Sequence, residues 1–386
     1  MQNFEFYNPV NVVFGKGQIT RLASLVPQGT KIMMTYGGGS IKSNGVYDQV
    51  VAALKGFDII EFSGIEPNPH YETLMKAVEI VKEKKVGFLL AVGGGSVLDG
   101  TKFIAAGANY TAGDPWEILA KRAYVASAIP IGTVLTLPAT GSEMNGGSVI
   151  TKAETKEKLA FMSPLVMPKF SILDPEVVFS LPDRQVANGI VDAFIHVMEQ
   201  YLTYPVNAPI QDRFAESILQ TLIEEGPKVL KNRTDYDAAA NFMWAATMAL
   251  NGLIGAGVPQ DWMTHQIGHE LTAFYGIDHG RTLAIVLPGM MRVKMANKKE
   301  KILQYGERVW NITNGSETER VEATIAKTVQ FFESLGVPTK LADYGVEADI
   351  IPVIKARFIK RGILAAGERG DLTPDQIAEI LELQRS

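Results

Sequence analysis

The sequence predicts an α/β protein with an N-terminal parallel-sheet domain and an all-helical C-terminal domain. Two observations support this fold class. Up to about residue 180, short apolar runs alternate with amphipathic stretches, which is typical of a parallel sheet covered by helices on both faces. Beyond Leu181-Pro182-Asp183, one helical pattern follows another. Because 386 residues exceed what a single core usually organises, we expect two domains, 1–182 and 183–386.

The expected elements of the N-terminal domain follow this alternation. The strands are expected at residues 11–14, 31–36, 58–62, 87–92, 129–137 and 170–173. The helices between them are expected at 19–26, 46–54, 71–84 and from Ser96 to about Ala106, and a hairpin is expected within 149–162.

Nine helices are expected after Pro182. They lie near residues 184–203, 208–230, 235–253, 260–274, 281–295, 299–310, 316–335, 348–361 and 373–384. Two of these helices have recognisable capping residues at their N-termini. Ser316-x-x-Glu319 is a capping box, and Thr373-Pro374 is an N-cap followed by proline at the first helical position.

Charge and hydropathy argue against several classes of function. The formal net charge is −5 and there is no long basic run, which argues against nucleic acid as a partner. No apolar stretch approaches the ~18–20 residues of a membrane span, so we expect no membrane contact. The first residues lack the basic and apolar segments of a signal peptide, so we expect a cytoplasmic protein.

Cysteine is absent, which excludes disulfides, a thiolate nucleophile, iron–sulfur clusters and Cys-ligated zinc. Any bound metal therefore has histidine and carboxylate ligands. The 5 histidines are His70, His196, His265, His269 and His279. His70 begins a charged, surface-like helix, and we assign it no role.

Two expected strands end in the same glycine-rich tetrad. Gly37-Gly38-Gly39-Ser40 follows one strand, and Gly93-Gly94-Gly95-Ser96 follows another. Glycines let a backbone approach a pyrophosphate closely, and the helix after Ser96 offers free N–H groups and a positive dipole end. Neither tetrad belongs to a G-x-G-x-x-G or Walker A motif. One such loop is often only a tight turn, but two at the same sheet edge favour a dinucleotide in a Rossmann-like domain.

The first tetrad bears on the choice of nicotinamide cofactor. NAD enzymes usually place an acidic residue near the adenosine ribose, whereas NADP enzymes replace it with small or basic groups. Residues 37–42 contain no acid, and Ser40 and Lys42 are suited to contact a 2′-phosphate. We therefore expect NADP(H) to be favoured over NAD(H).

Residues 189–201 are predicted to form a buried helix that carries Asp192 and His196 one turn apart on the same face. Burying both groups without a partner would be costly. One hypothesis is a divalent metal ion whose ligands are completed by His265 and His279. The alternative is a structural Asp–His hydrogen bond that orients two helices, which is the more common role of an isolated pair.

The three histidines further along leave three interpretations open. In the first, His265, His269 and His279 have no common role. In the second, His265 and His269 bind a metal as an H-x-x-x-H pair. In the third, His265 and His279 bind the metal while His269 carries protons beside the site. Spacing alone does not separate the last two.

Several motifs are specific when taken together. They are Gly93-Gly94-Gly95-Ser96-x-x-Asp99-x-x-Lys102, Leu137-Pro138-x-Thr140-Gly141-Ser142-Glu143, Asp192-x-x-x-His196, and His265-x-x-x-His269 with His279. Through them the chain resembles the iron-containing alcohol dehydrogenase superfamily over essentially its whole length. It looks closest to the butanol dehydrogenases and the bacterial broad-range NADPH-dependent aldehyde reductase, through Thr35-Tyr36-Gly37-Gly38-Gly39-Ser40 and Gly257-Val258-Pro259-Gln260-Asp261-Trp262.

The resemblance implies a set of site residues. Its metal ligands are Asp192, His196, His265 and His279, and His269 stays unligated near the substrate, as a candidate catalytic proton carrier. The pyrophosphate lies over Gly94, Gly95 and Ser96, with Asp99 near the nicotinamide as a cofactor-binding and candidate catalytic residue. The other expected cofactor contacts are Gly37, Gly38, Gly39, Ser40, Lys42, Gly93, Thr136, Thr140, Ser142, Asn145 and Lys158. One departure is Asp278-His279-Gly280, where many members have Pro-His-Gly.

The implied reaction is hydride transfer between NADP(H) and an aldehyde or primary alcohol, with Fe²⁺ or Zn²⁺ as a Lewis acid. The cleft between the sheet's carboxyl edge and the helical domain is the expected place for this reaction. The alternatives are a glycerol-type polyol dehydrogenase, an NAD-using synthase of the same fold, and a non-catalytic nucleotide or metal sensor. An exposed edge strand near residues 5–14, together with the habit of the family, leads us to expect a homodimer.

Overall fold

A computed structural model describes residues 1–386 and divides them into two compact units. The sheet unit consists of Tyr7–Pro182 and Asn232–Asn251. The helical unit consists of Met1–Phe6, Asp183–Lys231 and Gly252–Ser386. The units divide at the expected place after Pro182, but residues 1–6 and 232–251 each lie in the other unit from the one expected.

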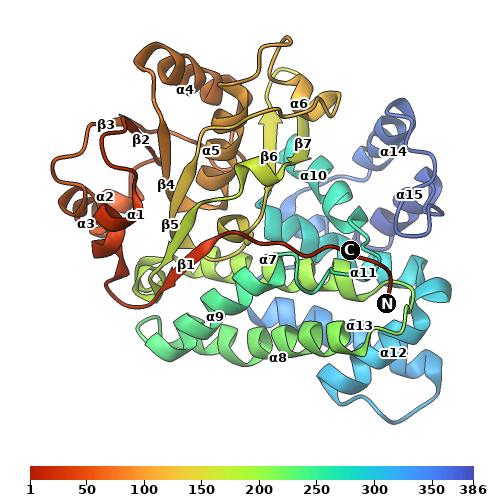
Figure 1. Ribbon diagram of the computed structural model, residues 1–386. Coiled ribbons are helices and arrows are strands. Elements are labelled where there is room, and N and C mark those ends of the chain that lie inside the picture. Colours follow the sequence, from red (N-terminus) through yellow and green to blue (C-terminus); the bar gives the residue numbers. More distant parts are fainter. The chain divides into compact units, whose positions relative to one another are not determined.

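The sheet unit is built on six parallel strands (Figure 1). The strands are β1 (Asn11–Phe14), β2 (Ile32–Thr35), β3 (Ile59–Phe62), β4 (Phe88–Gly94), β5 (Ile131–Leu137) and β8 (Phe170–Leu173). Their order across the sheet is β1-β8-β5-β4-β2-β3. The central strands β4 and β5 are buried over nearly their whole length, which explains their continuous apolar sequence. The predicted α/β fold class is confirmed.

Helices connect the parallel strands, and one helix from later in the chain packs in the same unit. The helices are η1 (Gln18–Arg21), α1 (Leu22–Leu25), α2 (Ser40–Ser43), α3 (Val46–Ala53), α4 (Tyr71–Lys84), α5 (Gly95–Gly107), α6 (Glu117–Ala120), η2 (Ser142–Met144), η3 (Pro164–Val166), η4 (Pro175–Ser180) and α9 (Tyr236–Ala249). Right-handed crossovers place α3 on one face and α4 and α5 on the other. The winding direction therefore reverses between β2 and β4, and their carboxyl ends form the switch point at which such sheets bind ligands.

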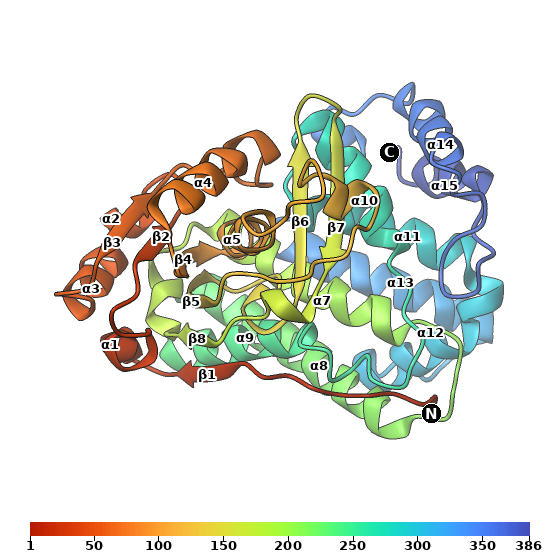
Figure 2. The ribbon, with the colours of Figure 1, turned by 45° about the horizontal axis from the view of Figure 1, so that its top comes forward.

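A hairpin stands apart from the sheet, as expected. Its antiparallel strands, β6 (Gly147–Lys152) and β7 (Glu157–Met162), lie side by side in Figure 2. The hairpin is attached to α5 through Ser148, whose hydroxyl donates to the backbone oxygen of Asp99 at 2.8 Å.

Helix α9 follows the helical unit's first two helices in sequence, yet it packs in the sheet unit. Its Phe242 and Met243 are fully buried. The Thr247 hydroxyl donates to Glu143 at 2.5 Å, beside the loop that follows β5. Helical periodicity carries no sign of such contacts, and the expected domain boundaries were therefore wrong for residues 232–251. The first residues are placed by backbone pairing, since the amide of Gln2 donates to the carbonyl of Gly257 at 2.9 Å.

The helical unit contains the other expected helices. They are α7 (Asp183–Tyr201), α8 (Pro209–Lys231), α10 (Met263–Tyr275), α11 (His279–Val293), α12 (Met295–Trp310), α13 (Glu317–Ser334), η5 (Ala342–Tyr344), α14 (Ile350–Lys360) and α15 (Pro374–Glu382). Both predicted helix starts are confirmed, and a side chain at the third position completes a capping box at Ser316 and at Thr373. The core includes Phe194 of α7, which packs edge-on against Phe332 with ring centroids 5.4 Å apart.

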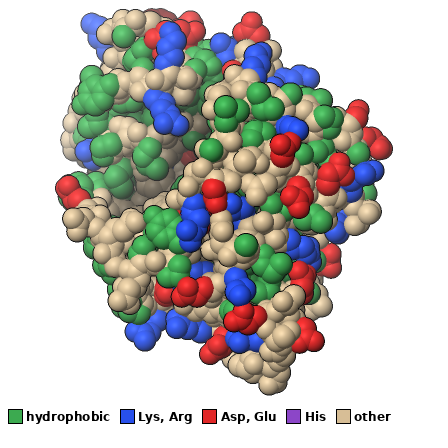
Figure 3. All heavy atoms as spheres, turned by 90° about the vertical axis from the view of Figure 1, so that its right-hand side faces the viewer, with side chains coloured by type: hydrophobic (Ala, Val, Ile, Leu, Met, Phe, Trp, Pro, Cys, Tyr) green, Lys and Arg blue, Asp and Glu red, His purple; other side chains and the backbone are tan.

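None of the helices combines the length and apolar character that a bilayer crossing requires. On the face shown in Figure 3, Lys and Arg side chains are interspersed with Asp and Glu, and no large area carries one sign of charge.

A buried lysine organises one end of the helical unit. Lys298 of α12 is 3% exposed, and its ammonium group donates to Asp261 at 2.9 Å and to Glu368 at 2.8 Å. It also donates to the backbone oxygen of Leu202 at 2.6 Å. Burial alone would lower the pKa of Lys298, but the two carboxyl groups outweigh it and raise this pKa above its ordinary value. The lysine thus joins α12 to the segments before α8 and α10 and to the loop before α15.

Replacing Lys298 tests this arrangement. In Lys298→Met, Asp261 and Glu368 lose their buried counter-charge, and we expect the free energy of unfolding to fall by about 3–5 kcal/mol in urea titrations. The neighbouring Lys299 is a matched control, because its pair with Glu317 is exposed. Lys299→Met should change stability by less than about 1 kcal/mol. Equal losses in the two variants would contradict the role given to Lys298.

Candidate functional site

Three helices of the helical unit bring a carboxylate and three imidazoles together. Asp192 and His196 lie on α7, His265 on α10 and His279 at the start of α11. The Asp192 Oδ1 atom is 3.4 Å from the Nε2 atom of His196, 3.9 Å from that of His265 and 3.7 Å from that of His279. The Nε2 atoms of all three histidines therefore lie within 3.9 Å of one Asp192 oxygen, and the donor atoms of Asp192, His265 and His279 are also mutually close.

These separations decide between the two interpretations of the Asp–His pair. They are longer than the roughly 2.7–3.2 Å of an ordinary N–H···O hydrogen bond. Neighbouring ligands around one tetrahedral ion lie about 3.3–3.5 Å apart for bonds of about 2.0–2.1 Å. The distance to His196 falls in this range, and those to His279 and His265 exceed it by about 0.2 and 0.4 Å. Donor atoms of Asp192, His265 and His279 all lie within 4.8 Å of one another. The residues present fit a divalent cation with nitrogen and oxygen ligands, such as Fe²⁺ or Zn²⁺.

Burial and ring packing hold the cluster in place. Asp192, His196 and His265 are 3%, 4% and 7% exposed, respectively. The rings of His196 and His265 are stacked with centroids 4.8 Å apart, so both Nε2 atoms face the same side. His279 is more open, with 22% of its side chain exposed. An ion held here would be shielded by the first two histidines and approached past the third.

His269 lies beside this cluster and outside the group of converging donors. Its ring centroid is 5.2 Å from that of His279 and 6.5 Å from that of His265. The geometry therefore favours His265 and His279 as the ligand pair over His265 and His269. His70 lies in the other unit, next to α4, where its Nδ1 atom is 3.9 Å from Glu66.

The departure Asp278-His279-Gly280 has a local explanation. The Asp278 carboxylate accepts a hydrogen bond from Arg184 at 2.6 Å and one from Asn188 at 2.8 Å, which ties the start of α11 to α7. Gly280 is required by the same contact, because a Cβ atom there would lie 2.4 Å from the backbone oxygen of Asn188. Asp278 thus anchors the His279 ligand to the helix that carries Asp192.

Sequence reasoning missed Glu199, which supports a predicted ligand. It lies three residues after His196 on α7 and is 4% exposed. Its Oε1 atom accepts the backbone N–H of His265 at 3.0 Å and lies 3.0 Å from the Nδ1 atom of the same residue. Burial raises the pKa of Glu199 well above its ordinary value, and Asp261 adds to this rise. The sequence did offer one sign of this role, because Glu199 is an acidic residue on the apolar face of the helix that carries Asp192 and His196.

The second group of predicted residues lies at the carboxyl edge of the sheet unit. The tetrads containing Gly37 and Gly93 follow β2 and β4, which are neighbours at the switch point. Side chains cannot be accommodated in the second tetrad. A Cβ atom would lie 2.5 Å from Val97 at Gly93, 2.9 Å from Leu137 at Gly94, and 2.4 Å from Thr140 at Gly95. Only backbone atoms therefore occupy the start of α5, and the first N–H groups of this helix are suited to bind a phosphate.

Asp99 participates in a network within the sheet unit. Its carboxylate accepts a hydrogen bond from Ser142 at 2.6 Å and one from the backbone of Val149 at 2.9 Å. Lys102, fully buried, donates to Ser142 at 2.8 Å and to Asn145 at 3.1 Å. Burial raises the pKa of Asp99, while the nearby Lys102 opposes that rise, and burial lowers the pKa of Lys102 to about 8. Asp99, Ser142 and Asn145, all expected to contact the cofactor, therefore lie in one network with Lys102, a residue that was assigned no role.

Lys158, on strand β7 of the hairpin, contacts residues near the carboxyl edge of the sheet through its side chain. It is 8% exposed, and its ammonium group donates to the side chain of Asn68 at 2.8 Å. The backbone N–H of Asn68 in turn donates to the Ser96 hydroxyl at 3.2 Å. Asn68 was missed by sequence reasoning, and its signal was an asparagine between two prolines in the loop after β3. Thr136 and Thr140 complete this edge at the end of β5.

Lys42 lies beside the first tetrad and against two aromatic rings. Its Nζ atom is 5.3 Å from the ring centroid of Tyr36 and 4.7 Å from that of Tyr47. Both tyrosine hydroxyls donate to Glu61, at 2.7 and 2.6 Å. This arrangement restricts the lysine, and Ser40 begins the short helix α2 next to it. Lys42 is thus held against two rings at the end of β2, and the hydroxyl groups of those rings donate to the neighbouring acid, Glu61.

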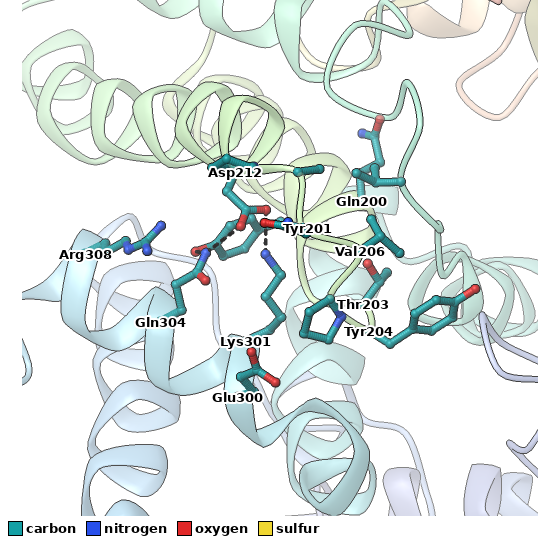
Figure 4. Close-up of a pocket in the computed structure, with 15 residues that line it drawn as sticks. Gln200, Tyr201, Thr203, Tyr204, Val206, Asp212, Glu300, Lys301, Gln304 and Arg308 are labelled. Atoms are coloured by element: carbon teal, nitrogen blue, oxygen red, sulfur yellow. Dashed lines mark hydrogen bonds and ion pairs between the residues drawn. The ribbon is translucent and has the colours of Figure 1, made fainter. Parts of the chain in front are cut away.

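A separate cavity of about 290 Å³ lies in the helical unit, near the turn between α7 and α8 (Figure 4). Figure 4 shows Asp212, Lys301 and Gln304 directed toward one another. Gln304 donates to Asp212 at 3.0 Å, and Lys301 is paired with the same carboxylate. Because these polar groups engage each other, we assign this cavity no ligand.

Comparisons with known proteins agree on one family. Residues 9–175 match the iron-containing alcohol dehydrogenase domain, and residues 186–384 match the C-terminal domain of the Fe-containing alcohol dehydrogenase family. The chain is 59% identical to the NADPH-dependent aldehyde reductase YqhD of Escherichia coli, over 100% of both chains. It is 44% identical to the probable NADH-dependent butanol dehydrogenase 1 of Bacillus subtilis, over 99% of both chains.

Solved structures show the same relationship. The crystal structure of E. coli YqhD matches with a TM-score of 0.99 at 58% identity, covering 100% of this chain and 99% of that one. The NADH-dependent butanol dehydrogenase A of Thermotoga maritima matches with a TM-score of 0.96 at 37% identity, covering 100% and 99%. Together with the converging aspartate and histidines, these matches show that the chain belongs to the iron-containing alcohol dehydrogenase family.

Proposed function

We propose that this protein reduces aldehydes to primary alcohols, and catalyses the reverse reaction, by hydride transfer from NADPH at a metal-dependent site. The observation that carries the proposal is the convergence of three imidazole Nε2 atoms within 3.9 Å of one Asp192 oxygen. Membership of the family and the printed activity of the relative with 59% identity support the same reaction. The direct test is the oxidation of NADPH with a panel of aldehydes that includes butanal, with identification of the alcohol formed.

We assign the metal to Asp192, His196, His265 and His279. When bound, a divalent ion supplies Lewis acidity for the substrate oxygen. One carboxylate and three neutral imidazoles leave a net positive charge on such a centre, which favours an oxygen that gains negative charge. The burial of Asp192 and His196 excludes water from one side of the cluster.

We assign proton transfer to His269. Its ring lies 5.2 Å from that of His279, close to the cluster, and it belongs to a different turn of α10 from the ligand His265. An imidazole exchanges protons readily near neutral pH. It is therefore suited to supply the proton that the alcohol oxygen requires after hydride transfer.

We place the cofactor at the carboxyl edge of the sheet unit, with its pyrophosphate over Gly94, Gly95 and Ser96. Lys158 and Asp99, each held by hydrogen bonds within the unit, are assigned to its nicotinamide half. Ser40 and Lys42 are assigned to a 2′-phosphate, which favours NADP(H) over NAD(H). The absence of an acid in residues 37–42 and the pairing of Glu61 with two tyrosine hydroxyls support this preference.

We also propose a homodimer formed through the edge of the sheet unit. Strand β1 pairs with β8 and lies at the edge of the six-stranded sheet. Exposed aromatic side chains lie on the same unit: Tyr7 is 74% exposed and Trp244 is 40% exposed, with Phe14 packed against Trp244. An open strand with apolar neighbours is a template for pairing between chains.

The metal assignment predicts different outcomes for two histidines on the same helix. His265→Ala should lose the bound metal and the reductase activity together, because a ligand is removed. His269→Ala should retain metal and lower turnover by about 10²–10⁴-fold, the usual contribution of a general acid. Metal content by elemental analysis and steady-state rates measure both. A His265→Ala protein that keeps its metal and its rate would refute the ligand set.

The cofactor assignment predicts a selective effect at Lys42. Loss of a charge-assisted contact worth about 1.5–3 kcal/mol corresponds to a rise in the KM for NADPH of about 10–100-fold in Lys42→Ala. The KM for NADH should stay nearly constant, because NADH has no 2′-phosphate. Lys121→Ala is the control, since that lysine pairs with Glu117 on an exposed helix. A similar rise for both cofactors would argue against contact with the 2′-phosphate.

The proposed dimer predicts a molar mass in solution of twice the 42.1 kDa chain. Light scattering coupled to size-exclusion chromatography measures it over a range of concentrations. A mass equal to that of one chain at micromolar concentrations would contradict the proposal.

A further inference from the structure

We propose that Glu199 is a positioning residue for the metal centre, which fixes the ring and the tautomer of His265 so that its Nε2 atom faces the ion. The inference rests on the proposed metal site, because it assigns a role toward that ion. It concerns a residue that no motif singled out.

The first observation is that one carboxylate oxygen lies close to two nitrogens of the same residue. Glu199 Oε1 accepts the backbone N–H of His265 at 3.0 Å, and the Nδ1 atom of that ring also lies at 3.0 Å. A backbone N–H is always a donor, so this oxygen acts as an acceptor. An acceptor opposite Nδ1 favours the tautomer that carries its proton there.

The second observation concerns the other nitrogen of the ring. The Nε2 atom of His265 lies 3.9 Å from Asp192 Oδ1, on the side where His196 and His279 also point. A metal ligand must present a lone pair, and it does so only when the proton of the neutral ring is on Nδ1. Glu199 therefore selects the tautomer that binding requires, through one contact with the ring and one hydrogen bond from the backbone of the same residue.

The third observation explains why Glu199 itself stays in place. It belongs to α7, the helix of Asp192 and His196, so one element carries two ligands and the support of a third. The backbone oxygen of Glu199 accepts the N–H of Asp261 at 2.8 Å, just before α10 begins. Asp261 is held in turn by Lys298 at 2.9 Å. The spacing of α7 and the start of α10 is therefore set at the residue that orients the His265 ring.

The test uses Glu199→Gln in the full-length protein. Glutamine has nearly the same shape, but its carbonyl is a weaker acceptor than a carboxylate, and its NH₂ group can turn toward Nδ1 and favour the wrong tautomer. Metal-free protein is titrated with Zn²⁺ in competition with a coloured chelator. We expect the dissociation constant for Zn²⁺ to rise by about 10–100-fold. With Co²⁺ in place of Zn²⁺, we expect a changed visible absorption spectrum, which a purely structural role would leave alone.

Glu216→Gln is the matched control. Glu216 is also a buried glutamate of the helical unit, 8% exposed, and its carboxylate is paired with Tyr201 and Arg308 rather than with a histidine of the cluster. It should bind Zn²⁺ as tightly as the unaltered protein. Equal affinity in Glu199→Gln and the unaltered protein, with both folded by circular dichroism, would overturn the proposal. His265→Ala separates the two hypotheses, since tight Zn²⁺ binding by that variant would refute the metal site itself.

A measurement on the unaltered protein keeps the proposal testable if Glu199→Gln does not fold. Histidine labelled with ¹⁵N reports ring tautomers by NMR, and the signals of His265 are identified by their loss in His265→Ala. We expect the proton of the neutral ring on Nδ1 in the metal-free protein. A proton on Nε2 would overturn the proposal.

Discussion

The structure depends on the approach of three histidine rings to a single oxygen of Asp192. The Nε2 atoms lie 3.4, 3.9 and 3.7 Å from that oxygen, which is longer than an ordinary hydrogen bond and close to the separation of two ligands on one cation. Such an arrangement requires three helices to meet at fixed distances. Two carboxylates of the helical unit serve that requirement: Asp278 ties α11 to α7, and the buried Glu199 ties α10 to α7.

The sheet unit contributes a different feature, which is a stretch of backbone without side chains that a phosphate can approach. Its winding reverses between β2 and β4, and both strands end in glycines at that point. The three glycines of the second tetrad are packed so closely that no Cβ atom fits. The buried Lys102 of α5 donates a hydrogen bond to Ser142, in the loop that follows β5. Positive dipole and free N–H groups at the start of α5 are then available to a ligand. In the proposed function, the glycine tetrads of the sheet unit bind phosphate and the Asp192 cluster of the helical unit binds the metal.

Many of the strands, helix starts and candidate ligands could be predicted because they depend on the pattern of residues close together in the sequence. Alternating apolar runs identified the six parallel strands, and the capping residues Ser316 and Thr373 identified two helix starts. Asp192 and His196 were placed on one face by helical period alone. Residues 232–251 were assigned to the wrong unit, because α9 looks like its neighbours in sequence and is distinguished only by what it packs against. Glu199, Lys298 and Asn68 were missed for the same reason, since their partners are distant in the chain.

The sequence by itself determined the fold class, the donor types available to a metal in a chain without cysteine, and the two glycine tetrads. These properties depend on composition and on the spacing of residues within a few helical turns, so they do not require knowledge of contacts between distant parts of the chain. Tertiary structure alone decided that His279, and not His269, joins His265 at Asp192, since both histidines are compatible with the spacing. It also decided which carboxylate supports His265 and which lysine compensates the buried acids. Those outcomes depend on distances between helices, and long-range packing sets such distances.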